Sequence, residues 1–102
     1  MPSLEQLEKL LAVDPEDAFV LYGLAQEHAR LGNLTRAVEF YDQCLKADPA
    51  YCYAYFHKAR AQQAQGQVDA AAATLRAGFS RAQVLGDTHA AAEISALLDE
   101  IT

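Results

Sequence analysis

The side chains of this sequence with the widest chemical repertoire are its histidines and its two cysteines. Cys44, Cys52 and His57 lie closest to one another along the chain. A zinc site takes four ligands at characteristic short spacings, and these three residues match none of the common patterns. Two cysteines also do not make a disulfide framework. The sequence therefore predicts no metal site, no cofactor and a reducing, cytoplasmic setting.

Other arrangements that support catalysis are missing from the sequence. It has neither a glycine-rich phosphate loop nor a His-Glu-x-x-His motif. The adjacent carboxylates at 16–17 and 99–100 fall at expected helix ends, where the first pair favours a helix N-terminus. Cys52 begins an expected helix, and the helix dipole there could lower the pKa of its thiol. With no clustered set of titratable groups, we predict that the protein is not an enzyme.

Composition narrows the class of partner. A chain of 102 residues, 52% of them hydrophobic, suits one small domain with a real core. The net charge of −6 argues against nucleic acid, because phosphate binding needs a basic face. No apolar run reaches the ~18 residues of a membrane span. Residues 1–5 lack the basic start of a secretory signal. We expect a partner other than nucleic acid or membrane.

The elements that must position any functional side chain are all expected to be helices. Alanine, the best helix former, is abundant, whereas β-branched residues are scarce. Apolar residues at helical spacing, interrupted by proline or glycine, predict about six helices. They span roughly 4–14, 16–31, 35–47, 51–65, 68–85 and 88–101. Because the connections are short, neighbouring helices should run antiparallel.

A spacing of 34 residues relates two parts of the chain. Asp14-Pro15 recurs at Asp48-Pro49. When residues 18–51 are aligned with 52–85, three positions are identical, and all three hold small residues. They are Ala25/Ala59, Gly32/Gly66 and Ala37/Ala71. Small residues suit sites where helices approach closely or the chain turns, and a period of this length is typical of a stacked helical array.

With this spacing the chain resembles the tetratricopeptide repeat (TPR) family. In the first repeat, the signature places hold Leu21, Leu24, Ala25, His28, Ala37, Tyr41 and Pro49. In the second, they hold Tyr55, Lys58, Ala59, Gln62, Ala71, Leu75 and Gln83. The second repeat is degenerate, because polar residues replace apolar ones and the closing proline is missing.

The resemblance implies an all-α fold, in which antiparallel helix hairpins form a right-handed superhelix, a TPR-like α-solenoid of about six helices. Residues 1–102 would form a single domain. Its expected parts are an N-terminal half-repeat helix (1–15), repeat 1 (18–51), repeat 2 (52–85) and a C-terminal capping helix (86–102). One helix pair cannot bury its apolar face alone, so pairs stack and the end helices cap the stack.

The resemblance also implies a concave face lined mainly by the first helix of each pair. Family geometry places eight residues there: Phe19, Tyr22, Gln26, Arg30, Tyr53, Phe56, Arg60 and Gln63. Aromatic residues and arginine are enriched at protein interfaces, and arginine can bind a carboxylate with two hydrogen bonds. The implied function is a non-catalytic module that binds a peptide or protein segment in this groove.

Other interpretations stay open at the level of sequence. Aromatic residues at helical spacing often belong to a core instead. The chain could also self-associate as a homodimer or a stack, or serve as a subunit of a larger assembly. Some family members hold chaperone tails with a Lys and Asn clamp, but Tyr22 and Gln26 occupy the first-repeat clamp positions here. The net charge of 52–85 is positive and could steer an acidic segment to repeat 2.

Overall fold

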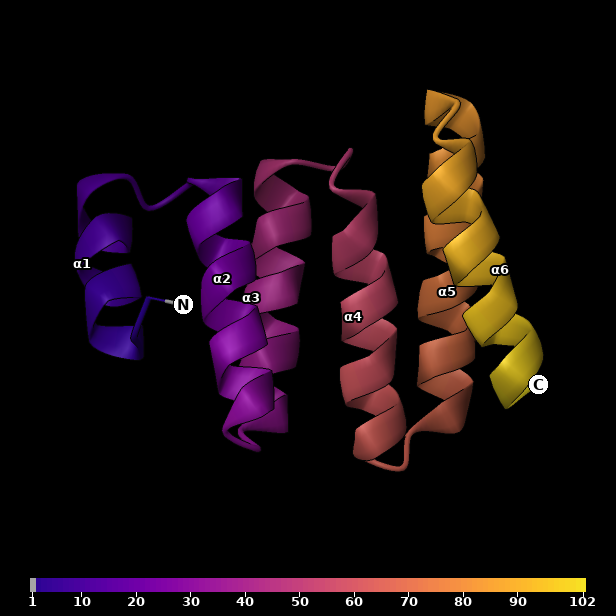
Figure 1. The fold of residues 1–102 in the computed structure, drawn as a ribbon, viewed down its shortest axis with the longest axis horizontal. Helices are drawn as coiled ribbons and strands as arrows, with labels where there is room; N and C mark the ends of the chain where they lie inside the picture. Colours follow the sequence, from indigo (N-terminus) through magenta and orange to yellow (C-terminus); the bar gives the residue numbers. More distant parts are fainter. Residues whose placement is uncertain (1) are drawn as a thin grey trace.

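A computed structural model describes residues 2–102, and Met1, the first residue of the expected half-repeat 1–15, lies outside the described residues. Residues 2–102 form six helices and no strand. The helices are α1 (Leu4–Val13), α2 (Ala18–Arg30), α3 (Leu34–Ala47), α4 (Cys52–Ala64), α5 (Val68–Leu85) and α6 (Thr88–Ile101). They are laid side by side in chain order, from α1 at one end to α6 at the other (Figure 1). The predicted all-α hairpin stack is confirmed.

Side-chain caps begin three of the helices. Ser3 and Gln6 form a capping box at α1, in which each side chain accepts a hydrogen bond from the other residue's backbone N–H. Asp17 accepts from the backbone of Phe19 and Val20 and so begins α2 two residues later than expected. Asp87 caps α6 in the same way. Each cap pairs backbone donors that have no partner within the helix.

Glycine ends α2, α4 and α5 with one shared geometry. Gly32, Gly66 and Gly86 all have φ between 71° and 84°, a left-handed conformation that other residues adopt only with strain. At the first turn, the N–H of Asn33 donates to the carbonyl of His28, at 2.8 Å. The residue after each of the other two glycines makes the equivalent bond. This Schellman motif pairs the last carbonyls of the helix.

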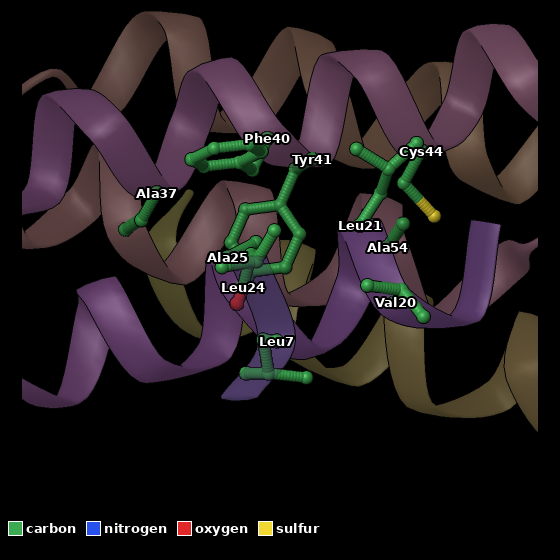
Figure 2. Close-up of a cluster of buried hydrophobic side chains, with 11 residues drawn as sticks. Leu7, Val20, Leu21, Leu24, Ala25, Ala37, Phe40, Tyr41, Cys44 and Ala54 are labelled. Atoms are coloured by element: carbon green, nitrogen blue, oxygen red, sulfur yellow. The ribbon is translucent and has the colours of Figure 1, made fainter. Parts of the chain in front are cut away.

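A large cluster of buried apolar side chains joins α1 to α4 (Figure 2). Its members are Leu7, Val20, Leu21, Leu24, Ala25, Ala37, Phe40, Tyr41, Cys44, Ala54 and Ala61. Leucine and aromatic side chains fill most of its volume. A second cluster joins α4, α5 and α6 and consists of Ala59, Ala71, Leu75, Ile94 and Leu97. The alanines shared by the two repeats are buried in these clusters, as close helix packing requires.

Helices α2, α4 and α6 line one face of the stack. Helix α4 contacts α2 on one side and α6 on the other. On the opposite face, among residues 2–102, α3 and α5 do not come into contact. Alternate helices therefore lie closer together on the first face, which makes it the concave one. No described helix has the length and apolar character needed to cross a membrane.

Candidate binding groove

An open hollow of about 500 Å³ lies between α2 and α4 on the concave face. Its lining combines polar and small residues: Gln26, Ala29, Arg30, Leu34, Tyr41, His57, Arg60, Ala61 and Ala64. Gln26, Arg30 and Arg60 are among the eight residues predicted for the groove. The small side chains of α2 and α4 leave room for a ligand, whereas the polar ones could position it.

Two lining residues of this hollow, Tyr41 and His57, belong to a group of packed aromatic rings. Tyr22 has its ring centroid 4.9 Å from that of Tyr51 and 6.0 Å from that of Tyr41. His57 lies 5.8 Å from Tyr22 and 5.1 Å from Phe56, both edge-on. These distances are those of favourable aromatic pairs. The five rings (Tyr22, Tyr41, Tyr51, Phe56 and His57), which we call the aromatic cluster, connect α2, α3, the start of α4 and α4 itself.

Burial tunes the titrating groups of the aromatic cluster. Desolvation raises the pKa of Tyr22 to about 12 and that of Tyr41 further still. The Tyr41 hydroxyl donates a hydrogen bond to Oε1 of Gln26, so the buried phenol is satisfied. Desolvation, reinforced by the charge of Arg60, lowers the pKa of His57. At neutral pH the cluster is therefore uncharged, and the charge of the hollow comes from its arginines.

The two arginines of the hollow differ in their pairing. Arg30 donates from Nε to Oε1 of Glu27 at 3.0 Å and also from Nη2. Glu27 is only 5% exposed, and the Arg30 hydrogen bond lowers the pKa of its carboxyl group. Arg60 has its guanidinium 5.8 Å from the Phe56 ring and forms no ion pair with any residue from 2 to 102. Arg60 is exposed, so its charge is available to a ligand.

A second hollow, of about 300 Å³, lies between α4 and α6. It is lined by Phe56, Arg60, Glu93, Ala96, Leu97 and Glu100. Phe56 is thereby the fourth of the predicted residues to line a hollow. Arg60 borders both hollows, so the two are neighbouring parts of one groove across α2, α4 and α6.

The other four predicted residues do not line either hollow. Phe19 is 73% exposed near the start of α2, and Tyr22 is half-buried in the aromatic cluster. Tyr53 is half-buried with its ring 6.3 Å from that of His89. Gln63 is exposed near the end of α4. Of the four aromatic residues predicted for the groove, Tyr22, Tyr53 and Phe56 are partly buried and only Phe19 is exposed. Most of these rings therefore belong neither to the core nor to the open surface.

Sequence reasoning missed Tyr41, His57 and Glu93 as lining residues. Tyr41 was assigned to the family signature, but it lines the hollow from α3, where its hydroxyl bonds to Gln26, another lining residue. His57 was considered only as a metal ligand. The available signal was its position three residues before Arg60, because residues i and i+3 share one helix face.

The cysteines and histidines do not form a reactive centre. Both cysteines are buried, and burial raises the pKa of Cys44 to about 11. Burial likewise raises the pKa of Cys52, with a contribution from Asp87. The expectation that the α4 dipole lowers this pKa is therefore wrong, because desolvation dominates. Residues 2–102 contain no group of three or more His, Cys, Asp or Glu side chains placed to hold a metal ion.

The fold and groove define a stack of helix hairpins with a concave face, and the chain matches models of the tetratricopeptide repeat at residues 18–51 and 40–73. It is 30% identical to a TPR repeat-containing protein of Pseudomonas aeruginosa over 98 residues, 96% of this chain and 93% of that protein. The chain belongs to the tetratricopeptide repeat family.

Solved structures of the same class superpose on most of the chain. The TPR2B domain of yeast Sti1, in its complex with pHsp70, has a TM-score of 0.89 and 26% identity. That match covers 96% of this chain and 78% of the yeast one. A tetratricopeptide repeat domain protein from Salinibacter ruber has a TM-score of 0.79 and 30% identity, covering 86% and 89%.

Proposed function

We propose that this protein is a non-catalytic interaction module that binds a peptide or protein segment in the groove across α2, α4 and α6. The observation that carries this proposal is the hollow between α2 and α4. Tyr41 and His57 of the aromatic cluster line it, and it is bordered by the exposed Arg60, which has no ion-pair partner among residues 2–102. An exposed arginine beside aromatic rings is typical of an interface anchor.

Two further observations support a protein or peptide as the ligand. The exposed ring of Phe19 and the partly exposed rings of Tyr53 and Phe56 follow the same face of α2 and α4. Large aromatic rings supply contact area at a low entropic cost. The yeast Sti1 domain, similar along nearly the whole chain, was solved in complex with pHsp70. The eight residues predicted for the groove are proposed as its contact surface.

Site-specific photo-crosslinking tests the proposed groove. The photoreactive residue p-benzoylphenylalanine would replace Ala64, which lines the α2–α4 hollow. In a matched control it would replace Ala77, an exposed residue of α5. We expect partners from native lysate to be crosslinked at position 64 and not at position 77. Equal crosslinking at both positions, or at position 77 alone, would contradict binding in the groove.

Self-association is a second candidate function, favoured by one feature of α1. Leu10 and Val13 are 52% and 86% exposed and border an apolar hollow of about 710 Å³. Exposed apolar patches often mark interfaces. Light scattering over a range of concentrations tests it, with Leu10→Ser/Val13→Ser as the comparison. A mass that grows with concentration in the wild type only would support a copy-to-copy contact, whereas a constant monomer would exclude it.

A further inference from the structure

The two hollows of the groove carry opposite charge, and their order points to the chemistry of the partner. We infer that the groove selects an extended segment that places an acidic side chain in the α2–α4 hollow and a basic side chain in the α4–α6 hollow. This inference rests on the proposed function, because it requires that the groove bind a segment of protein.

The α2–α4 hollow is the basic end. It contains the guanidinium groups of Arg30 and Arg60 and no carboxylate among its lining residues. The nearby Glu27 offsets Arg30, since the two form an ion pair. Arg60 has no such partner among residues 2–102, so its donors are free for a carboxylate. A basic side chain placed here would meet like charge.

The α4–α6 hollow is the acidic end. Glu93 and Glu100 line it, and the exposed Asp99 precedes Glu100. Helix α6 has no lysine or arginine, and its one ion-pair contact within residues 2–102 is between His89 and Glu93, at 3.2 Å. A histidine neutralises a carboxylate only when it is protonated. Arg60 borders this hollow as well, but two carboxylates outnumber it.

The distance between the hollows sets the spacing of the partner's charges. Packed helices lie about 8–10 Å apart, so moving from the α2–α4 hollow to the α4–α6 hollow is a step of about one helix spacing. An extended chain advances about 3.3 Å per residue. The acidic and basic residues of the segment should therefore stand about three positions apart. The Phe56 ring lines the α4–α6 hollow, where it offers apolar contact to the stem of the basic side chain.

A displayed library of random 12-residue peptides tests this charge order. It would be selected on the wild type, on Arg60→Glu and on Glu93→Lys/Glu100→Lys. Arg76→Glu in α5 and Glu8→Lys in α1 are matched controls, because both residues are exposed and line neither hollow. Circular dichroism would verify that each variant is folded.

We expect wild-type and control selections to enrich peptides with one acidic and one basic residue about three positions apart. Arg60→Glu should weaken a selected peptide by about tenfold, the effect of losing one good interface contact. Peptides selected on Arg60→Glu should lose the preference for an acidic residue and keep the preference for a basic one. Peptides selected on Glu93→Lys/Glu100→Lys should lose the preference for a basic residue and keep the preference for an acidic one. Enriched peptides without this charge pattern would overturn the inference and leave the groove proposal standing. Failure to enrich any peptide would overturn both.

Discussion

The hairpins α2–α3 and α4–α5 have equivalent turns and equivalent buried alanines, yet different side chains hold them together. In the first hairpin, the ring of His28 stacks on that of Phe40, with centroids 5.4 Å apart. In the second, the residues 34 positions later are Gln62 and Thr74, and the Thr74 hydroxyl donates to Gln62 Oε1 at 2.6 Å. One pair of positions is thus bridged by aromatic contact in one hairpin and by a buried hydrogen bond in the other.

The difference extends to the size of the side chains between the helices. Tyr41 and Cys44 fill the first hairpin, whereas the equivalent places in the second hold Leu75 and Gly78. The first hairpin is therefore filled by the ring of Tyr41, whereas the missing side chain at Gly78 lets α5 come close to Tyr55 of α4 at that point. The comparison shows that the two repeats share their backbone arrangement, whereas the side chains that fill the space between their helices differ.

The largest expected effect comes from the signature leucine of the first hairpin. Leu24 is fully buried in the α1–α4 cluster, and Leu24→Ala should lower the free energy of unfolding by about 3 kcal/mol, because it leaves a cavity. Its counterpart Lys58 forms an ion pair with Asp42 at 2.6 Å and is partly exposed. Lys58→Ala should cost about 1 kcal/mol or less. Urea denaturation measures the free energy of unfolding of both variants. Equal losses would mean that these equivalent positions contribute equally to their hairpins, contrary to the comparison.

The buried hydrogen bond of the second hairpin gives the next effect. Thr74→Val should cost about 1–3 kcal/mol, because Gln62 Oε1 would remain buried without its donor. The double variant Gln62→Leu/Thr74→Val removes both polar groups and should recover most of that loss. A double-mutant cycle from urea denaturation measures the coupling. Additive losses would mean that the bond does not hold α4 to α5.

Two helical glycines, Gly78 and Gly23, differ in how much space surrounds them. A methyl group at Gly78 would lie 2.6 Å from Tyr55 Cβ, an atom fixed to the α4 backbone. Gly78→Ala should therefore cost about 1–2 kcal/mol despite the better helix propensity of alanine. At Gly23 the methyl would meet Leu7 Cδ2 at 3.2 Å, the end of a flexible side chain. Gly23→Ala should change stability by less than about 1 kcal/mol, so thermal melts that rank the two variants the other way would contradict the close approach of α4 and α5.

The smallest expected effect is a pH dependence carried by α4. Burial and Arg60 lower the pKa of His57 in the folded chain, with Glu93 opposing them. The unfolded chain therefore binds a proton more readily, and stability should fall as the pH drops below about 6.5. His57→Gln should flatten this slope between pH 7.5 and 5.5 in urea denaturation. If the pH dependence of stability were the same in His57→Gln as in the wild type, titratable groups other than His57 would cause it.

The sequence predicted the fold well because its strongest signals are local and periodic. The Asp-Pro pairs and Gly32 and Gly66 end helices through local backbone geometry. The start of α2 was predicted two residues too early, because Asp17 is its N-cap and not part of its first turn. A carboxylate is favourable at both positions, so the sequence does not distinguish them.

The groove was predicted less completely, because its lining depends on how helices meet. The resemblance to the family placed Arg30 and Arg60 on the concave face, and pairing with a neighbour such as Glu27 is the ordinary alternative for such arginines. The near-complete burial of Glu27 could not be predicted, since burial depends on how the helices pack. The acidic lining supplied by Glu93 likewise depends on the placement of α6 against α4. The peptide-binding role of the groove and the cytoplasmic setting stay predictions.

Backbone amide chemical shifts provide the most direct test of the central claim, that the concave face across α2, α4 and α6 receives a protein segment. The labelled full chain would be titrated with a peptide selected from the random library. We predict that shift changes concentrate at Gln26, Arg30, His57, Arg60 and Glu93, and spare the exposed faces of α3 and α5. Changes confined to α3 and α5, or to Leu10 and Val13 at the hollow beside α1, would contradict the account.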